Sequence, residues 1–385
     1  MKKNVKILLV GGGTGGHIFP LLAVAGELDK IARENGLGLK ISYFGQKNEF
    51  SQILIDSGIR FSSVISSKLN RNVSLANLFM PFKFLAGLFQ SLWKVFWLMP
   101  DAVFSKGGPG ALPILFACKF FFIPIIIHES DSIPGLTSVI SGKLAKKIFV
   151  GFESTANYFY GRNVTVSGNP VRYDLVSQKS KELEIEDAKA DAKRHFGFDA
   201  NLPVLMILGG SQGATRLNDF ILENLRVFLN QFQILHQVGS ANYESYKKDY
   251  EIFTKDWSPN EKQRYQFHGF FGNDLAKAYV ATDLVLARAG AGTIFELAYF
   301  GKPSILIPLP EAANNHQLKN AIEYEKNGAA IIIQQENLLG NLVASQLTDL
   351  LNNKEALSKM SLAAEAFYRP DSASVIAQEI LKFAV

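Results

Sequence analysis

Short apolar runs alternate along the chain with longer segments in which apolar residues recur at helical spacing. The first run, Lys6–Val10, ends in a glycine-rich turn, and the residues from Leu21 to Leu28 then follow the spacing of one helix face. A later run, Ile123–Ile127, is mostly isoleucine, as a parallel strand covered on both faces requires. This alternation predicts an α/β fold with parallel sheets. The other predicted strands are Leu39–Phe44, Ala102–Phe104, Ile148–Gly151, Val164–Val166, Pro203–Leu208, Ile234–Gln237, Tyr265–His268, Leu284–Ala287 and Ser304–Ile307.

The unit of strand, glycine turn and helix occurs twice. Gly11–Gly16 holds five glycines in six residues, and Gly209–Gly213 follows a second apolar strand in the later half of the chain. A chain of 385 residues is long enough for two domains. We therefore predict two doubly wound, Rossmann-like domains with a cleft between them. The stretch Ser167–Arg172, which contains Gly168, Asn169 and Pro170, is the predicted boundary between a domain of residues 1–169 and a domain of residues 170–369.

The most apolar part of the chain, residues 73–100, predicts an amphipathic helix and not a membrane span, because a proline and several polar residues interrupt it. Large apolar side chains form a broad face, and Lys83, Gly87, Gln90 and Lys94 form a narrow polar stripe. Aromatic residues beside lysines suit a helix at a bilayer interface, but the same face could pack on the sheet. As a third alternative, one edge of the helix could be buried and the other exposed to lipid. The candidate membrane residues are Phe82, Phe89, Trp93, Lys94 and Trp97.

Composition and charge narrow the class of protein. The single cysteine, Cys118, excludes a disulfide framework and a cysteine-based zinc site, and it fits a reducing cytosol. The net charge of +5 is uneven: residues 1–170 carry 18 Lys and Arg against 9 Asp and Glu, whereas residues 171–385 carry 22 against 26. The basic half predicts a surface that faces phosphate, nucleic acid or membrane lipid, with ordinary solubilising charge as the alternative.

Glycine-rich turns at strand ends predict anion sites, because glycines let the backbone approach closely and helix N-termini attract negative charge. The opening turn Gly11–Gly16 fits the dinucleotide spacing, but the second strand ends in Gly45-Gln46-Lys47 without the acid that would hold a ribose, which argues against NAD. Polar residues follow two more strands, at 105–110 and at 128–131, where a local hydrogen-bonded turn is the alternative. The three strand ends are expected at one edge of the sheet.

Two stretches of the second half carry candidate chemistry for a sugar nucleotide. The run Arg288–Glu296 combines a glycine-rich helix start with Thr293 and Glu296, whose spacing suits either a capping box or contacts with phosphate and sugar hydroxyls. Residues 308–317 end in Asn314-Asn315-His316-Gln317. Such an amide-rich loop either hydrogen-bonds an uncharged sugar or forms a plain surface turn.

Together these motifs resemble the MurG family of N-acetylglucosaminyltransferases. The resemblance implies a GT-B fold whose last helix, about residues 370–385, packs back on the first domain. It implies an inverting transfer of GlcNAc from UDP-GlcNAc to the MurNAc 4-hydroxyl of undecaprenyl-pyrophosphoryl-MurNAc-pentapeptide (lipid I), which makes lipid II for peptidoglycan synthesis. No metal or other cofactor is implied. The motifs that carry the resemblance are residues 12–20, 128–131, 134–136, 168–172, 209–214, 288–296 and 316–317.

The resemblance assigns the donor to the second domain and the acceptor to the first. His17 is the candidate general base, since a histidine has a pKa near neutral, and Asp131 is its rival. A peripheral protein on the cytoplasmic face of the plasma membrane is implied, in contact with the anionic inner leaflet and with cell-wall synthesis proteins but not with nucleic acid. The implied donor residues are Arg172, Ser211, Gln212, Phe271, Thr293, Glu296, His316 and Gln317. The residues implied around the acceptor pyrophosphate are Gly13, Thr14, Gly15, Gly16, Gly107 and Gly108.

The sequence departs from the family pattern at three places. The Gln pair of some relatives is His316-Gln317 here, which is a conservative change for hydrogen bonding. Gly107-Gly108-Pro109-Gly110 lacks the aromatic residue that relatives usually carry after the paired glycines. His128-Glu129-Ser130-Asp131 stands where other members have His-Glu-Gln-Asn, so Asp131 and a water-mediated route stay open beside His17. The alternative classes are a GT-B enzyme that glycosylates diacylglycerol, a UDP-sugar epimerase of the same fold, a NAD-dependent dehydrogenase and a non-catalytic nucleotide-binding module.

Overall fold

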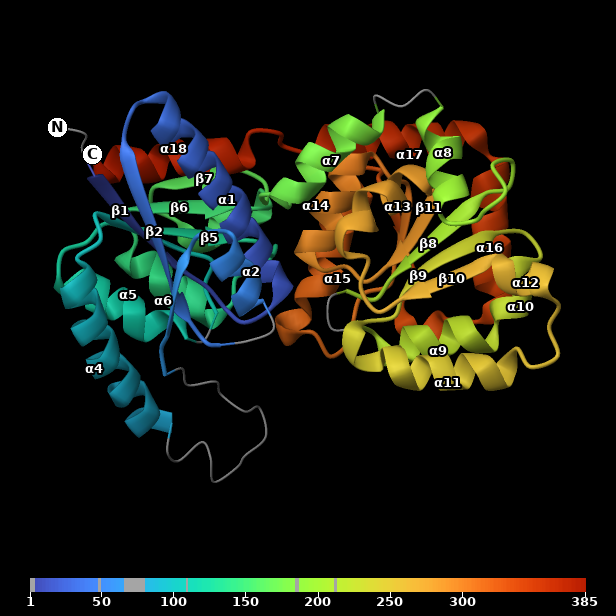
Figure 1. Ribbon diagram of the computed structural model, residues 1–385, viewed down its shortest axis with the longest axis horizontal. Helices are drawn as coiled ribbons and strands as arrows, with labels where there is room; N and C mark the ends of the chain where they lie inside the picture. The colour runs from blue at the N-terminus through green and yellow to red at the C-terminus, as the bar shows by residue number, and fades with distance from the viewer. Residues whose placement is uncertain (1–3, 48–49, 66–79, 109, 184–186, 211–212) are drawn as a thin grey trace. The chain divides into compact units, whose positions relative to one another are not determined.

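The computed structural model describes residues 4–47, 50–65, 80–108, 110–183, 187–210 and 213–385. The chain forms two compact units, Met1–Tyr173 with Arg369–Val385 and Asp174–Tyr368 (Figure 1). The division after Tyr173 lies just beyond the boundary that the sequence predicts after residue 169. The last helix belongs to the first unit.

The first unit is built on a parallel seven-stranded sheet with the strand order β3-β2-β1-β4-β5-β6-β7. The order reverses between β1 and β4, as in a Rossmann fold, and this reversal marks the place where ligands bind at the carboxyl ends of the strands. The register places Val10 of β1 beside Ser105 of β4. The strands are β1 (Asn4–Val10), β2 (Gly38–Gly45), β3 (Arg60–Ser63), β4 (Ala102–Ser105), β5 (Ile125–Glu129), β6 (Lys147–Val150) and β7 (Val164–Val166).

Helices cover both faces of this sheet because alternate residues of each strand point to opposite sides. Ile7 and Leu9 pack in a core with α1 and α18, whereas Leu8 and Val10 pack in a second core with α5. In Figure 1, α18 lies alongside α1, and Ile376 and Ile380 of α18 are fully buried there. The helices are α1 (Gly15–Glu34), α2 (Ser51–Asp56), α4 (Met80–Leu98), α5 (Ala111–Phe120), α6 (Leu136–Leu144), the 3-10 helix η1 (Ser154–Phe159) and α18 (Ser372–Ala384).

The second unit repeats this plan with a parallel six-stranded sheet in the order β10-β9-β8-β11-β12-β13. Its switch point lies between β8 and β11. The strands are β8 (Val204–Leu208), β9 (Gln233–Gln237), β10 (Tyr265–His268), β11 (Leu284–Ala287), β12 (Ser304–Leu306) and β13 (Ala330–Ile332). The helices are α7 (Tyr173–Leu183), α8 (Ala188–His195), α9 (Thr215–Glu223), α10 (Leu225–Leu229), η2 (Ser240–Asn242), α11 (Tyr243–Phe253), α12 (Pro259–Gln263), η3 (Gly272–Asp274), α13 (Leu275–Ala281), α14 (Ala291–Phe300), η4 (Ala313–Asn315), α15 (His316–Lys326), η5 (Gln335–Asn337), α16 (Gly340–Asn352) and α17 (Lys354–Phe367).

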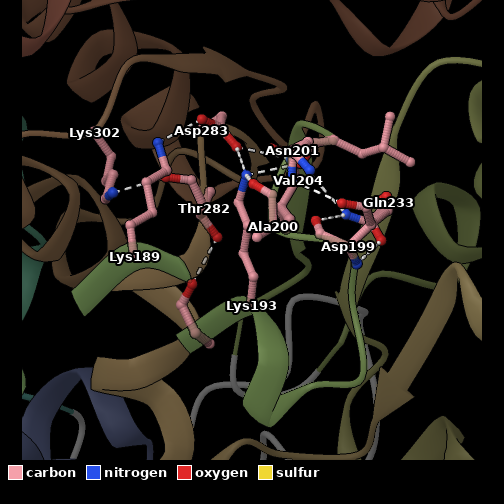
Figure 2. Close-up of polar contacts among 12 residues, drawn as sticks. Lys189, Lys193, Asp199, Ala200, Asn201, Val204, Gln233, Thr282, Asp283 and Lys302 are labelled. Carbon is pink, nitrogen blue, oxygen red and sulfur yellow. Dashed lines mark hydrogen bonds and ion pairs between the residues drawn. The ribbon is translucent and has the colours of Figure 1, made fainter. Parts of the chain in front are cut away.

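A group of lysines and one aspartate ties the strand starts of the second sheet together (Figure 2). The Asp283 carboxylate, just before β11, accepts from the Val204 amide at 2.8 Å and forms ion pairs with Lys189 at 2.5 Å and Lys193 at 3.2 Å. The Lys302 ammonium, just before β12, donates to the Thr282 carbonyl at 2.8 Å. These contacts lie at the amino ends of the strands, away from the edge where ligands bind in such sheets.

Candidate functional site

Two glycine turns meet at the switch point of the first sheet. One turn follows β1 and the other follows β4, and these strands are neighbours. Gly108 has a φ of +92°, and a Cβ added there would lie 2.8 Å from the Cα of Gly12. The turns are therefore packed backbone to backbone, which only glycine at position 108 allows. The structure thus brings the predicted acceptor residues of the two turns together. Pro109 lies outside the described residues.

The amino end of α1 forms one side of this edge. The helix begins at Gly15, and its N-cap residue Thr14 makes no side-chain cap bond to the first turn. The first turn also contains no acidic residue. Because the first amides of a helix have no partner inside the helix, Gly15 and Gly16 present N–H groups and the positive end of the helix dipole to an anion.

His17 lies in this first turn of α1, with its ring against Gly12. Its Nδ1 is 2.8 Å from the Thr14 hydroxyl oxygen. Burial first, and then the Lys106 cation, lower the pKa of His17 to about 4, against an opposing effect of Asp131. The expectation of a pKa near neutral is therefore wrong for the unbound protein. The imidazole is neutral at physiological pH, which is the protonation state that a general base requires.

The end of β5 is a hydrogen-bonded part of the same edge. His128 and Glu129 are the last two residues of the strand, and both are buried. Glu129 Oε1 accepts from the Asp131 amide at 3.0 Å, and the Asp131 carbonyl accepts from the Thr155 hydroxyl at 2.9 Å. Asp131 is thereby held from both sides, close enough to His17 to act on its pKa.

Arg172 belongs to the first unit, whereas the other predicted donor residues belong to the second. It is buried in the first unit, and its guanidinium carbon lies 4.2 Å from the ring centre of Phe19 on α1. The sequence assigns it to the second domain, near the nucleotide. A contact with the nucleotide stays a prediction.

The start of α14 excludes one of the two interpretations of Thr293 and Glu296. The N-cap of α14 is Gly290 with no side-chain cap bond, so Thr293 lies inside the first turn and the capping-box interpretation is wrong. Glu296 Oε2 instead accepts from the Tyr279 hydroxyl at 3.1 Å. Thr293 thus stands at a glycine-rich helix start, as the phosphate interpretation requires.

The loop before α15 carries the next two predicted donor residues. Gln317 Oε1 accepts from the Leu309 amide at 3.0 Å, which turns the side chain toward the strand end after β12. His316 Nδ1 donates to the Ala313 carbonyl at 2.8 Å, so Nε2 is the ring atom left for a further hydrogen bond.

The remaining predicted donor residues are Phe271, Ser211 and Gln212. The Phe271 amide donates to Gln237 Oε1 at 3.3 Å, and its ring packs on His268. Ser211 and Gln212 lie outside the described residues.

Three buried polar side chains that reach these strand ends were not among the predicted site residues, although Lys106 and Arg288 lie in stretches that the sequence analysis names. In the second unit, Arg288 donates to the Ile307 carbonyl at 3.2 Å, and Asn320 donates to the Ala289 carbonyl at 3.3 Å. In the first unit, the buried Lys106 stands directly before the paired glycines. A lysine between an apolar strand and two glycines is the sequence signal that could have identified it.

The amphipathic helix α4 turns three of the four residues of its polar stripe toward the protein, whereas the fourth, Lys83, is exposed. Gly87 is buried, Gln90 Oε1 accepts from the Ile65 amide at 2.8 Å, and the Lys94 ammonium donates to the Ser63 carbonyl at 2.6 Å. The aromatic face points outward: Phe82 is 69% exposed, Phe89 70%, Trp93 66% and Trp97 68%. Of the predicted membrane residues, Lys94 is thus the one that faces inward. Phe120 and Phe122 at the end of α5 are also exposed and were not predicted.

No described helix is long and apolar enough to span a bilayer. Among the same residues, no group of three or more His, Cys, Asp or Glu side chains is gathered so that it could hold a metal ion.

Comparison with known proteins matches both units. Residues 7–150 match the family model described as the glycosyltransferase family 28 N-terminal domain, and residues 204–376 match the C-terminal domain of the same family. A relative from Bacillus cytotoxicus is 32% identical over 372 residues, which cover 96% of this chain and 97% of the relative. Its name is UDP-N-acetylglucosamine--N-acetylmuramyl-(pentapeptide) pyrophosphoryl-undecaprenol N-acetylglucosamine transferase.

Solved structures show the same fold. The crystal structure of Acinetobacter baumannii MurG is 28% identical in sequence, with a TM-score of 0.70 over 98% of this chain and 99% of that one. A UDP-GlcNAc 2-epimerase from Neisseria meningitidis has a TM-score of 0.67 over 98% of this chain and 100% of its own, but it is only 16% identical and shows the fold alone.

Proposed function

The chain belongs to glycosyltransferase family 28 and, within it, to the MurG family, and from this premise we propose that it transfers GlcNAc from UDP-GlcNAc to the MurNAc 4-hydroxyl of lipid I. The product is lipid II. The observation that carries the proposal is the meeting of two glycine turns beside a neutral histidine, His17, at the switch point of the first sheet. An acceptor with a pyrophosphate next to the reacting sugar needs those two features side by side.

The acceptor pyrophosphate is proposed to lie on the amino end of α1. The amides of Gly15 and Gly16 and the turn at Gly107–Gly108 would donate to its oxygens. The negative charge of the bound pyrophosphate would favour the imidazolium form of His17, so its pKa would rise from about 4 toward the ordinary value. His17 would thereby become a stronger base once the acceptor is in place.

Thr14 is proposed to set the tautomer of His17. For Nε2 to take the proton from the acceptor hydroxyl, Nδ1 must carry the ring hydrogen and donate it to the Thr14 hydroxyl oxygen at 2.8 Å. Asp131, which acts on His17 electrostatically, would stabilise the imidazolium that forms. Asp131 itself as the base is the alternative.

The donor is proposed to bind the second unit. The start of α14 with Thr293 would contact the phosphates, Glu296 the ribose, and His316 and Gln317 the sugar hydroxyls. The acceptor oxygen would attack the anomeric carbon from the face opposite UDP, which inverts the configuration. The amides at the helix start would offset the charge that grows on the leaving diphosphate. Arg172, Phe271, Ser211 and Gln212 stay proposed donor contacts.

A membrane surface is proposed as a partner, because the acceptor carries an undecaprenyl chain. The ring of Phe96 on α4 lies 6.1 Å from that of Phe121, which packs on Phe120 at the end of α5. Phe120 and Phe122 are exposed like the aromatic residues of α4. The exposed lysines Lys83 and Lys119 lie on the same two helices and would meet anionic headgroups. We propose that the enzyme docks by this face on the cytoplasmic leaflet of the plasma membrane, where cell-wall synthesis proteins are further proposed partners.

The direct test is incubation of the purified protein with labelled UDP-GlcNAc and lipid I. The expected product is lipid II, heavier than lipid I by one GlcNAc residue in the mass spectrum. Diacylglycerol in place of lipid I tests the related lipid glycosyltransferases. UDP-GlcNAc alone tests the epimerase, which would release UDP-ManNAc. Product from either of these reactions and none from lipid I would refute the proposal.

Replacement of Thr14 by valine is expected to lower kcat about tenfold, because the loss of one neutral hydrogen bond of about 1.4 kcal/mol frees the tautomer of His17. The dissociation constant of UDP-GlcNAc, measured by calorimetry, should not change, since Thr14 lies in the first unit. Thr14→Ser keeps the hydroxyl and serves as the control. Equal turnover of the valine and serine variants would show that the hydroxyl does not orient the ring.

A further inference from the structure

Lys106 is a buried lysine at the carboxyl end of β4, directly before Gly107 and Gly108. Only 4% of the residue is exposed. Its amide donates to the Val10 carbonyl at 2.9 Å, so its backbone continues the pairing of β4 with β1 up to the two glycine turns. The charged end of the side chain therefore lies within the edge where the acceptor is proposed to bind.

Every proton of the Lys106 ammonium has an acceptor. Nζ lies 2.6 Å from His128 Nδ1, 2.5 Å from Ser130 Oγ and 3.0 Å from Asn169 Oδ1. His128 Nε2 is 2.8 Å from the Gly168 carbonyl, which can only accept, so Nε2 carries the ring hydrogen and Nδ1 accepts from Lys106. Ser130 donates its own proton to Asn169 at 3.1 Å and thus accepts from Lys106. This pattern uses all three protons of a charged ammonium.

These bonds join segments that are distant in the sequence. Lys106 follows β4, His128 and Ser130 stand at the end of β5, and Asn169 follows β7. Since β6 lies between β5 and β7, the ammonium spans several strand ends at one edge. Removal of the ammonium would leave buried acceptors without a donor, which loosens this edge.

The positive charge of Lys106 is not cancelled by its direct partners. All three acceptors are neutral groups: an imidazole nitrogen, a hydroxyl and an amide oxygen. Burial lowers the pKa of Lys106 to about 7, while the nearby carboxylates of Glu129 and Asp131 raise it. Lys106 and His17 both border Gly11: a Cβ added to Gly11 would lie 3.6 Å from the Cβ of His17 and 3.9 Å from the Cβ of Lys106. After burial itself, the charge of Lys106 is accordingly the main effect that lowers the pKa of His17, and Asp131 opposes it.

We propose that Lys106 is a positioning residue of the transfer reaction. It holds the ends of β4 and β5 and the segment after β7 in one edge, and its ammonium places a positive charge beside His17 and the glycine turns. The inference rests on the proposed function. The charge attracts the acceptor pyrophosphate and keeps His17 unprotonated until the acceptor binds.

The test is Lys106→Met, which keeps the length of the side chain and removes the charge. Loss of a neighbouring cation makes protonation of His17 easier, so the pKa of His17 should rise from about 4 toward its ordinary value. NMR titration of the histidine ring protons measures this shift, with the His17 signal identified by its loss in His17→Ala. The kcat/KM for lipid I should fall about tenfold at neutral pH, and the acidic limb of its pH profile should move to higher pH. The dissociation constant of UDP-GlcNAc should not change.

Lys302→Met is the matched control. Lys302 is likewise a lysine whose pKa burial lowers to about 7, but its ammonium donates to the Thr282 carbonyl in the second unit, among the residues of Figure 2. This variant should leave the pKa of His17 and the acidic limb unchanged, whatever it does to stability. Lys106→Arg keeps the charge, so the pKa of His17 should stay low in that variant.

An unchanged pKa of His17 together with an unchanged kcat/KM in Lys106→Met would overturn the proposal. So would loss of the near-ultraviolet circular dichroism in both Lys106→Met and Lys106→Arg, because Lys106 would then be a folding residue. If the wild-type protein makes no lipid II, the proposed function fails, and the NMR titration still decides whether Lys106 controls the protonation of His17.

Discussion

Replacement of His17 by alanine is expected to lower kcat by about 10²–10⁴-fold, the range that a general base contributes, while UDP-GlcNAc still binds. The base must take the proton of the MurNAc 4-hydroxyl as that oxygen attacks, and alanine has no group that can do so. His17 lies in the first unit, whereas the proposed sugar-binding residues His316 and Gln317 lie in the second. Turnover is measured as lipid II formed at saturating substrates, and donor affinity by calorimetry.

The pH dependence of the wild-type enzyme provides an independent check on His17. The profile of kcat/KM reports the free enzyme, in which the pKa of His17 is about 4, so its acidic limb should lie near pH 4. The profile of kcat reports the complex, in which the bound pyrophosphate favours the imidazolium. The acidic limb of kcat is therefore expected at higher pH than that of kcat/KM.

His195→Ala is the control for the His17→Ala substitution. His195 is a partly exposed histidine of the second unit, 3.5 Å from Asp274, and it has no proposed part in the reaction. Its replacement should leave turnover unchanged. Turnover of His17→Ala close to that of the wild type would remove His17 as the base, and a large loss in Asp131→Asn would then assign the role to Asp131.

The double substitution Trp93→Glu with Trp97→Glu is expected to weaken binding to phosphatidylglycerol vesicles by about 10²-fold. Both side chains are about two-thirds exposed, and burial of each in the interface should contribute about 1.5 kcal/mol. The added carboxylates would also be repelled by anionic headgroups. Vesicle sedimentation measures the partition, and activity toward a water-soluble short-chain acceptor should remain.

The orientation of α4 decides which substitutions test docking. Lys94 donates to the Ser62 hydroxyl at 2.7 Å and to the Ser63 carbonyl at 2.6 Å, so its replacement would disturb the packing of α4 and not the outer face. Ile252→Glu with Phe253→Glu removes a comparably exposed apolar pair from α11 and should leave vesicle binding unchanged. Equal vesicle binding by the wild type and the Trp93/Trp97 variant would exclude this face as the lipid-binding surface.

Most of the parallel strands could be predicted from the sequence, because a strand covered on both faces is a short run of apolar residues. Runs of this kind identify β1, β2 and β4 through β12. The two strands that were missed, β3 and β13, are both edge strands with partly exposed residues. β3 carries a single apolar residue, Phe61, so its local pattern does not separate it from a loop. β13 lies in the apolar run Ala329–Ile333, which the prediction overlooked.

The candidate site was predictable where its residues belong to motifs at strand ends. The turns after β1 and β4 could be expected at one edge, since parallel pairing brings the carboxyl ends of neighbouring strands together. The capping-box interpretation of Thr293 and Glu296 was wrong, because α14 begins at Ala291 and not after Thr293. Helix starts depend on the strand and turn that precede them, and spacing alone does not define them.

By itself, the sequence determined the fold class, the repeated strand–glycine–helix unit and the family, because periodicity and contiguous motifs are local properties. The tertiary structure alone decided the contacts between distant segments. It placed Lys106 against His128, Ser130 and Asn169, which lie 22, 24 and 63 positions further along the chain. It also turned Gln90 and Lys94 of the α4 polar stripe inward and lowered the pKa of His17. Burial and electrostatic effects depend on the groups that surround a side chain in space, and the neighbouring residues in the sequence do not determine those groups.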